Sequence, residues 1–149
     1  IIIYCLGMVN KMDVMSKDSR RKIMTSIRNK DTKIELLLRR ELWREKIRYR
    51  KNLKCIIGKP DIVILKDKIA IFCDGDFWHG KNFYNKKFCI NKEFWEEKIK
   101  RNMERDLEVT ILLRDMGWTV IRFWESDIIL DVHKCVEIVK KHLKYSEKT

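Results

Sequence analysis

The sequence lacks the patterns that most readily assign a chain to a class. Its five cysteines are widely spaced and include no C-x₂-C pair, which argues against a zinc ribbon or finger. Their odd number argues against a disulfide framework, so a reducing cytoplasm is the expected setting. The apolar run IIIYCLG is far too short to span a bilayer and lacks the features of a signal peptide. No repeat or low-complexity linker divides the 149 residues, which fit one domain.

The beginning of the chain differs from the rest of it. It opens without a methionine, and three methionines then occur by position 15. Met15 and Ser16 immediately precede sequence with regular helical signals. We therefore expect residues 1–14 to be a non-native or disordered extension, and residues 15–149 to form the folded domain.

Positive charge is what the sequence has in excess. Lys and Arg number 34 against 22 Asp and Glu, which gives a formal net charge of +12. Such a balance favours a polyanion as partner, and nucleic acid is the first candidate. Five tryptophans support that interpretation, because aromatic rings can stack on bases or wedge between them. The alternative is an ordinary basic protein without such a partner.

Capping signals and hydrophobic periodicity predict one α/β domain with the order α-α-β-β-β-α-β-α. Thr32-x-x-Glu35 resembles a capping box at the start of the second helix, and Gly117 ends the long third helix. Ser126 is expected to cap the last helix. The two central strands are apolar on both faces, so the sheet should be covered on two sides. The expected helices span residues 17–29, 32–46, 92–116 and 127–144, and the strands span residues 47–54, 61–65, 69–73 and 118–124.

One segment carries most of the chemistry, GKPDIVILKDKIAIFCDGDFWH. If its hairpin is centred on Asp67, a symmetric register places Asp61 opposite Cys73 with Cβ atoms ~5 Å apart, and Asp74 follows. Two carboxylates and a backbone carbonyl then meet at one end of the sheet, and such oxygen clusters suit Mg²⁺. His79 lies five residues further on, where it can titrate beside the cluster.

Two other interpretations of this segment stay open. Asp61 follows Gly-Lys-Pro, so it can be an ordinary turn aspartate. Against that, two bare carboxylates at this place would repel each other unless a cation lay between them. A zinc site gathered from Cys73, His79 and Cys89 is the other possibility.

The loop around His79 favours a functional role. Glycines flank it, Phe77 and Trp78 precede it, and acids lie nearby. Neighbouring side chains on an extended segment cannot both point into one core face. At least one ring is therefore exposed, either at the rim of the core or as a wedge that inserts into DNA.

A further acid lies on an apolar helix face. At 100° per residue, Asp106 is the one acid on the stripe of Trp95, Ile99 and Leu113, while the other acids of that helix fall on the far side. A buried carboxylate needs a partner. That partner is either an arginine such as Arg122 or a catalytic histidine that the acid holds.

Glu35 also has more than one interpretation. As the last member of the capping box it can return a hydrogen bond to the start of the helix. It can also pair with Arg39 one turn later. Both interpretations are structural, and a functional role is the alternative.

Five segments in a fixed order carry a resemblance to a known family. They are SRRKIMTSIRNKDTKIELLLRREL, GKPDIVI, IFCDGDFWHG, FWEEKIKRNMERD and LRDMGWTVIRFWE. Over residues 15–125 the chain resembles the very short patch repair (Vsr) mismatch endonucleases, which belong to the restriction-endonuclease-like PD-(D/E)xK superfamily. The resemblance implies a single domain with a mixed central sheet flanked by helices.

The resemblance implies a DNA endonuclease that nicks one strand 5′ to the thymine of a T:G mismatch by Mg²⁺-dependent hydrolysis. The substrate would be double-stranded DNA with the mismatch, and mismatch-repair proteins would be the partners. The resemblance implies a monomer in the nucleoid, without a membrane association. The alternatives are a restriction-like nuclease acting on another DNA structure and a non-catalytic DNA-binding module. The acids expected beside phosphates argue against the second alternative.

The family's functional residues carry over by position. Asp61 matches the metal-binding aspartate, and Cys73 lies where the family binds the metal through a backbone carbonyl. His79 matches the catalytic histidine, and Glu35 and Asp106 match acids that support it. The matches to DNA-contacting aromatic and apolar residues are Phe77, Trp78, Trp95 and Met24. The basic residues expected to position the DNA backbone are Arg20, Arg21, Lys22, Arg28 and those of residues 48–54.

The chain departs from the family pattern at the structural zinc site. Where the family has three cysteines and one histidine, the matching positions here are Asp76, Lys81, Phe83 and Ser126. None of these supplies the family's ligand, so we expect no structural zinc. Asp74 stands where the family can have a histidine, and we expect it to add a carboxylate to the Mg²⁺ site.

Overall fold

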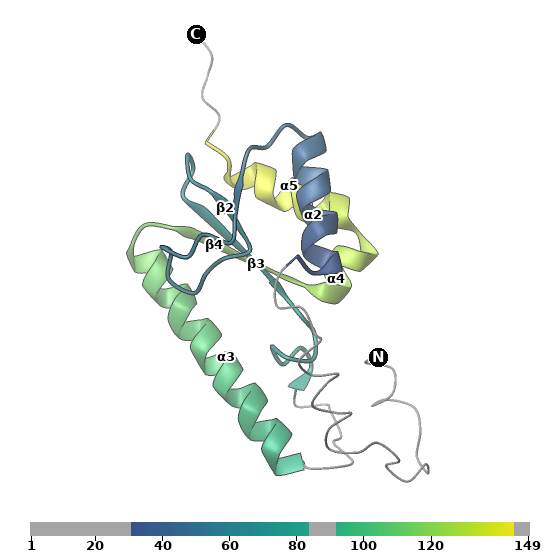
Figure 1. The fold of residues 1–149 in the computed structure, drawn as a ribbon, viewed down its shortest axis with the longest axis vertical. Helices are drawn as coiled ribbons and strands as arrows, with labels where there is room; N and C mark the ends of the chain where they lie inside the picture. The colour runs from purple at the N-terminus through teal and green to yellow at the C-terminus, as the bar shows by residue number, and fades with distance from the viewer. Residues whose placement is uncertain (1–30, 84–91, 145–149) are drawn as a thin grey trace.

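The computed structural model describes residues 31–83 and 92–144. The strands are β1 (Arg50–Lys51), β2 (Ile62–Ile64), β3 (Ile69–Asp74) and β4 (Thr119–Trp124), and the helices are α2 (Lys33–Arg44), α3 (Lys92–Asp115), α4 (Glu125–Leu130) and α5 (Val132–His142). The sheet has the order β1-β2-β3-β4, with antiparallel pairs up to β3 and a parallel β3–β4 pair. It separates α3 from α2, α4 and α5 (Figure 1), which confirms the predicted mixed sheet flanked by helices. Residues 1–14 and the expected helix over residues 17–29 lie outside the described residues.

Helix α2 begins at the predicted capping box. The Thr32 hydroxyl accepts the N–H of Glu35 at 3.5 Å and donates to Oε1 of Glu35 at 2.9 Å. The helix ends at Arg44, slightly before the predicted end, because Lys46 has a left-handed φ of 60° that no helix continues. The fully buried Leu38 lies on its inner face. The capping box therefore fixes where this helix enters the domain.

The strand predicted over residues 47–54 is much shorter than expected. Only Arg50 and Lys51 pair with β2. Asn52 adopts a φ of 49° and ends the strand, and its N–H donates to the carbonyl of Asp61 at 3.3 Å. The chain thus turns away from the sheet next to the predicted active-site aspartate.

The β2–β3 hairpin forms as predicted, but its register differs by one residue. Ile62 pairs with Ile71, so the observed register brings Asp61 beside Phe72 and not opposite Cys73. The cause is a four-residue turn in which Lys68, with a φ of 52°, donates its N–H to the carbonyl of Leu65 at 3.2 Å. The expectation of a turn centred on Asp67 was wrong. A slip of one residue moves every side chain of a strand to the other face of the sheet.

The sheet is covered on both faces, as the apolar strands predicted. Ile69 and Ile71 of β3 belong to the larger core, which packs against α2, α4 and α5. Ala70 and Phe72 alternate with them and pack against Leu113 of α3. Asp74 follows Phe72 by two residues and so continues the side that faces α3.

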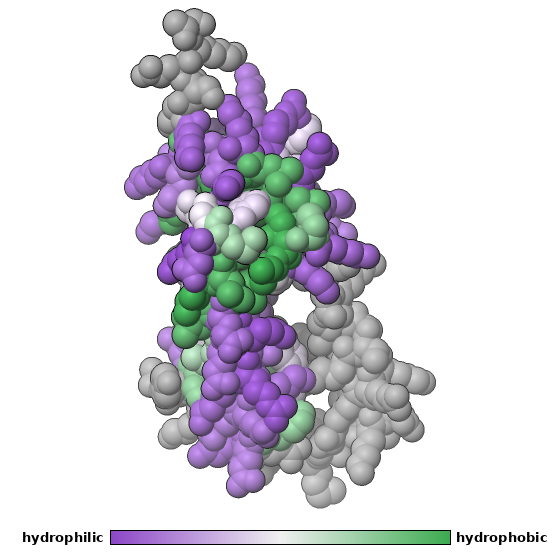
Figure 2. Space-filling model, turned by 90° about the vertical axis from the view of Figure 1, so that its left-hand side faces the viewer, coloured by the Kyte–Doolittle hydropathy of each residue, from purple (hydrophilic) through white to green (hydrophobic). Residues whose placement is uncertain are grey.

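Helix α3 matches its predicted length closely and ends in the predicted glycine. Gly117 has a φ of 81°, and the N–H of Trp118 reaches back to the carbonyl of Leu113 at 2.9 Å. The N-terminal half of the helix presents a hydrophilic face, whereas apolar side chains gather over the C-terminal half (Figure 2), where Leu107 and Ile111 are exposed. Among the described residues, no helix has the length and apolarity needed to cross a membrane.

The last predicted helix is in fact two helices, so the expectation of one helix capped by Ser126 was wrong. Helix α4 begins at Glu125, directly after β4, with no side-chain cap at Trp124. The break falls at Asp131, whose φ of −155° is not helical and whose carboxylate accepts the N–H of Lys134 at 3.0 Å. Asp131 therefore acts as the N-cap that starts α5 in a new direction.

Candidate active site

Asp61 lies at the entrance to β2 with its carboxylate directed at β3. Its Oδ2 accepts the N–H of Cys73 at 2.8 Å, and its carbonyl accepts Nη2 of Arg39 at 3.1 Å. Burial, together with the charges of Glu35 and Asp74, raises the pKa of this carboxyl to about 6, against the opposing hydrogen bond from Cys73 and the charge of Arg39. The site therefore disfavours a bare negative charge at Asp61.

Glu35 is held in a structural network. Its Oε2 accepts Nη2 of Arg39 at 2.8 Å and the N–H of Asp31 at 3.0 Å, while its Oε1 accepts the Thr32 hydroxyl. The side chain is only 3% exposed. Both structural interpretations of Glu35 are thus met at once. Its charge acts on Asp61, while its hydrogen bonds go to the start of α2.

A second cluster lies between the sheet and α3. Nδ1 of His79 is 2.5 Å from Oδ2 of Asp106 and 3.6 Å from Oδ1 of Asp74. Nη1 of Arg122 donates to both oxygens of Asp74, at 3.0 and 2.8 Å, and lies 3.6 Å from Asp106. Both partners predicted as alternatives for Asp106 are therefore present, with the histidine closer.

Arg122 connects the two acids of this cluster because it stands on the strand next to β3. Phe72 and Arg122 are paired in the parallel β3–β4 register, and the guanidinium lies over the Phe72 ring, 4.3 Å from its centroid. Nε of Arg122 donates to the hydroxyl of Thr110 at 3.1 Å. The sequence named Arg122 only as a partner for Asp106. The contact of its Nη1 with both oxygens of Asp74 follows from the pairing of β3 with β4, which the sequence did not reveal.

The two titratable groups of the His79–Asp106 pair shift in opposite directions. Burial disfavours the imidazolium, but the hydrogen bond to Asp106 and the charge of Asp74 outweigh it, so the pKa of His79 lies above its ordinary value. For Asp106, burial works against the charged form, and the hydrogen bond from His79 and the charge of Arg122 hold the pKa below its ordinary value. Asp106 therefore remains ionised and orients the imidazole.

Contacts with α3 fix the loop that carries His79. Nδ2 of Asn102 donates to the carbonyl of Trp78 at 2.9 Å. Gly80 has a φ of 80°, and a Cβ there would lie 2.5 Å from the sulfur of Met103. The left-handed backbone and the close approach of the Met103 side chain both favour glycine at this position.

Aromatic rings gather beside His79. The ring centroids of Phe77, Trp78 and Trp95 lie 5.1 to 5.8 Å from one another, and Nζ of Lys98 lies 5.0 Å from the Trp78 ring. All three rings are half-buried and belong to neither core cluster. The sequence-predicted DNA-contacting residues in this region thus form one cluster with a cation next to it.

Hydrogen bonds join three of the four positions that match the family's zinc ligands. Nζ of Lys81 donates to the hydroxyl of Ser126 at 2.5 Å and to Oδ1 of Asp127 at 2.9 Å. The N–H of Ser126 donates to Oδ1 of Asp76 at 3.3 Å, and Phe83 is buried nearby in sequence. Here an ammonium group joins the His79 loop to the start of α4. The absence of a structural zinc stays a prediction.

The predicted metal ligands and the predicted DNA-binding residues of the N-terminal segment have different outcomes. Within residues 31–83 and 92–144, no group of three His, Cys, Asp or Glu side chains is arranged to hold a metal ion. Cys73 is the predicted carbonyl ligand, and it lies next to Asp61 through its own N–H. Met24, Arg20, Arg21, Lys22 and Arg28 lie outside the described residues.

Comparisons with known proteins agree with one another. A sequence model of the DNA mismatch endonuclease Vsr matches residues 12–85. The chain is 44% identical to the type II nicking enzyme V.NmeDIP of Neisseria meningitidis serogroup C, over 89% of this chain and 91% of the relative. It is 46% identical to the type II nicking enzyme V.HpaIIP of Haemophilus parainfluenzae, over 83% and 89%. It is also 37% identical to the DNA mismatch endonuclease Vsr of Escherichia coli K12, over 76% and 73%. The chain therefore belongs to the Vsr family of DNA mismatch endonucleases, and it is a DNA-cleaving hydrolase with a restriction-endonuclease-like fold.

Proposed function

We propose that this endonuclease nicks one strand of duplex DNA 5′ to the thymine of a T:G mismatch, in very short patch mismatch repair. The observation that carries the proposal is the His79–Asp106 pair at 2.5 Å, which lies beside Asp74 and follows the strand that receives Asp61. Two relatives are named nicking enzymes and a third is named a mismatch endonuclease, which supports both nicking and the mismatch.

His79 is the proposed general base. With the Nδ1–H donating to Asp106, the other ring nitrogen, Nε2, is free to accept a proton from water. Asp106 keeps the tautomer and orientation of the ring and stabilises the imidazolium that forms. The expected products are a 3′-hydroxyl and a 5′-phosphate.

The Asp61 side of the site fits a divalent cation. Burial is the main cause of the raised pKa of Asp61, and the charges of Glu35 and Asp74 add to it against the opposing charge of Arg39. A cation there would stabilise the ionised carboxylate. In a strand the N–H and C=O of one residue point to the same side, so the Cys73 carbonyl faces the side that holds Asp61. Asp61 and the Cys73 carbonyl would hold Mg²⁺, which would polarise the scissile phosphate and stabilise the leaving 3′ oxygen. Asp74 already gives both oxygens to Arg122, so its part is to add negative charge next to the ion.

The aromatic cluster is proposed to open the mismatch. Phe77, Trp78 and Trp95 are half-buried beside His79, and Lys98 adds positive charge to the same surface. Such rings can insert between base steps and unstack them, at a cost of a few kcal/mol that is smallest at a mismatch. Glu35 is proposed to act through Asp61 by holding Arg39 and by its charge.

The proposed site lies within a single chain, which supports action as a monomer. The nucleoid, which holds the DNA substrate, is the proposed location. His79, Asp106 and Asp61 all come from the same described domain, and none needs a second copy to complete its contacts. Light scattering of the protein with and without a T:G duplex tests this. One protein chain per duplex is the expected result, and two would contradict it.

A strand-resolved nicking assay tests the proposal. Duplexes carrying T:G, matched C:G or another mismatch at one position, each labelled on either strand, are incubated with and without Mg²⁺. We expect Mg²⁺-dependent cleavage of the thymine strand in the T:G duplex alone. Cleavage of all duplexes would indicate a restriction-like nuclease with another target, and binding without cleavage would indicate a binding module.

A further inference from the structure

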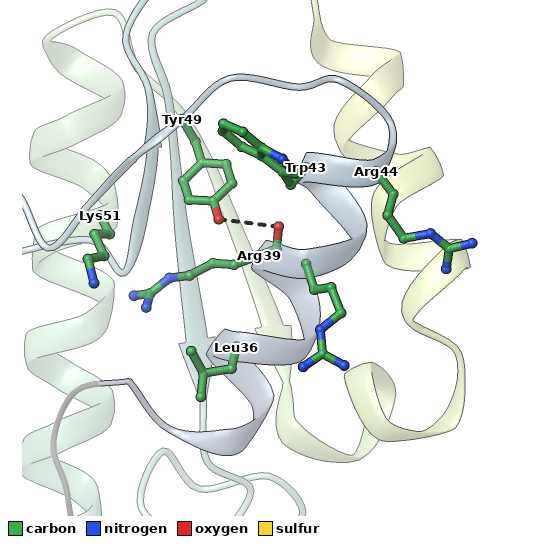
Figure 3. A pocket seen from close by; sticks show the side chains of 7 residues that line it. Leu36, Arg39, Trp43, Arg44, Tyr49 and Lys51 are labelled. Carbon is green, nitrogen blue, oxygen red and sulfur yellow. Dashed lines mark hydrogen bonds between the residues drawn. The ribbon is translucent and has the colours of Figure 1, made fainter.

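A surface groove lies between α2 and the edge strand β1, outside the candidate active site. It has a volume of about 490 Å³, and Trp43 of α2 and Tyr49 and Lys51 from the segment at β1 line it (Figure 3). Arg40 of α2 also belongs to its lining. Its volume is within the range of pockets that accept small ligands or single nucleotides. The proposed reaction uses none of these side chains.

Charge is one-sided in the groove. Its lining includes three arginines and a lysine but no carboxylate. Among the residues that the structure describes, Arg40 is exposed and has neither an ion pair nor a hydrogen bond. Lys51 is 62% exposed, and its contact with Asp31 is long, at 3.7 Å. Arg39 is paired with Asp31 and Glu35, and Arg44 is paired with Glu41. Arg40 and Lys51 are therefore the lining cations that no acid in the described part of the chain neutralises closely.

An aromatic wall stands next to these cations. Trp43 is 57% exposed, which is unusual for a side chain of its size. The guanidinium of Arg48 lies over its ring, 4.2 Å from the centroid, and adds one more positive charge at the rim. Tyr49 donates its hydroxyl to the carbonyl of Arg39 at 3.2 Å, which fixes the floor of the groove (Figure 3).

A buried donor in the groove lining lacks an acceptor. Nε of Arg39 is the one buried side-chain nitrogen or oxygen in the described part of the chain without a hydrogen-bond partner. The side chain is only 5% exposed, and it runs along the groove toward Lys51 (Figure 3). A buried donor without a partner is unfavourable.

The groove is continuous with the active site through the same arginine. Nη2 of Arg39 donates to the carbonyl of Asp61, and the carbonyl of Asp61 also accepts the N–H of Asn52, the residue after Lys51. A DNA strand whose scissile phosphate lies at Asp61 therefore passes close to this groove.

We propose that the groove between α2 and β1 binds the sugar–phosphate backbone of the DNA that flanks the cleavage site, with Arg40 and Lys51 on the phosphates and Trp43 against the sugar. The inference rests on the proposed function, because it takes the DNA cleaved at Asp61 as the occupant. The contact is independent of base sequence, since it involves backbone atoms only.

Binding measurements with Arg40→Ala test the groove without relying on cleavage. The full-length protein is titrated onto a long T:G duplex over a range of salt concentrations. Loss of one phosphate contact predicts roughly tenfold weaker binding at low salt, and a slope of log K against log salt that is smaller by about 0.9. Arg40→Lys keeps the charge and should keep the slope. Trp43→Ala should weaken binding while leaving the slope unchanged.

Arg114→Ala is the matched control, since Arg114 is an exposed arginine on α3, on the opposite side of the sheet. Duplexes shortened stepwise from either end locate the flank, because one shortened duplex should bind wild type and Arg40→Ala equally. Equal binding of wild type and Arg40→Ala to the long duplex, or an equal loss with Arg114→Ala, would overturn the proposal. If wild type does not nick T:G duplexes but Arg40→Ala still binds DNA more weakly than wild type, the proposed reaction is refuted and the groove proposal is not.

Discussion

The two halves of the candidate site differ in how their charges are balanced. At the His79 end each acid has a cation: Asp106 has the imidazole at 2.5 Å, and Asp74 has Arg122 at 2.8 Å. At the Asp61 end the carboxylate has a backbone N–H and two further acids nearby, and its pKa rises to about 6.

This difference separates a part of the site that is complete from one that is not. The His79 cluster is held by ion pairs and by hydrogen bonds to α3, so protein groups alone fix its geometry. At Asp61 the charge of Arg39 offsets only part of the effect of burial and of the charges of Glu35 and Asp74, so the ionised carboxylate stays disfavoured. We therefore assign proton transfer to the first part and cation binding to the second, and the two assignments can be tested separately.

The largest expected effect is on the Asp61 side. Asp61→Asn keeps an oxygen that can accept the Cys73 N–H but removes the charge that holds the cation. We expect at least ~10³-fold slower nicking of a T:G duplex, with DNA affinity nearly unchanged. Single-turnover cleavage measures the first and a filter-binding titration the second. Nicking at the wild-type rate would remove Asp61 from the mechanism.

Loss of the proposed general base, His79, is the next effect in size. His79→Ala should slow single-turnover nicking by at least ~100-fold, the range of one general base. The acid limb of the pH–rate profile should disappear along with it. If the variant cleaves as fast as wild type, another group activates the water.

Asp106→Asn changes the same half of the site more mildly. Removing the carboxylate lowers the pKa of His79, which Asp106 and Asp74 hold above its ordinary value. Because the base must be neutral, wild-type activity should fall as pH drops through that raised pKa, and the fall should move to lower pH in the variant. We expect a roughly 10- to 100-fold loss at neutral pH. A pH–rate profile with an unmoved acid limb would show that Asp106 does not act through His79.

Unfolding measurements in metal-free buffer compare the two halves by stability. The folded pKa of Asp61, about 6, exceeds the ordinary value of 3.8. Ionisation of Asp61 therefore begins to destabilise the fold as the pH rises through the ordinary pKa, and the destabilisation is complete above the folded pKa. Well below the ordinary pKa it has no effect. Asp61→Asn should thus be more stable than wild type near pH 7.5, by up to about 3 kcal/mol, and equally stable near pH 3.5. Urea unfolding at both pH values measures this. A variant less stable than wild type at neutral pH would contradict the charge imbalance.

The smallest effect concerns the link between the His79 loop and α4. Lys81→Met removes the contacts to Ser126 and Asp127 and should lower the free energy of unfolding by about 1 kcal/mol. Lys54→Met, at an exposed lysine, is the control and should change it little.

Metal analysis of purified wild-type protein should find no tightly held zinc. One zinc per chain would contradict the predicted loss of that site.

Local sequence signals predicted the elements better than the pairing between them. The capping box at Thr32 and the glycine at Gly117 were placed correctly, because caps depend on a few adjacent residues. The hairpin register was wrong by one residue, because a symmetric turn was assumed and Lys68 takes a left-handed φ.

The site follows the same division. The helical stripe correctly predicted that Asp106 needs a partner, since helix periodicity is a local property. The pairing of Arg122 with Asp74 was not predicted, because it depends on which strand lies beside β3. The break at Asp131 was missed because one aspartate in an amphipathic segment resembles an ordinary exposed helix residue.

The most direct test of cation binding at Asp61 is the response of the protein–DNA complex to Mg²⁺. Wild type and Asp61→Asn are each bound to a T:G duplex with a non-hydrolysable scissile linkage, and the melting temperature is followed as Mg²⁺ is titrated. We predict that Mg²⁺ raises the melting temperature of the wild-type complex and leaves that of Asp61→Asn unchanged. An equal rise in both complexes would contradict a cation site built on Asp61.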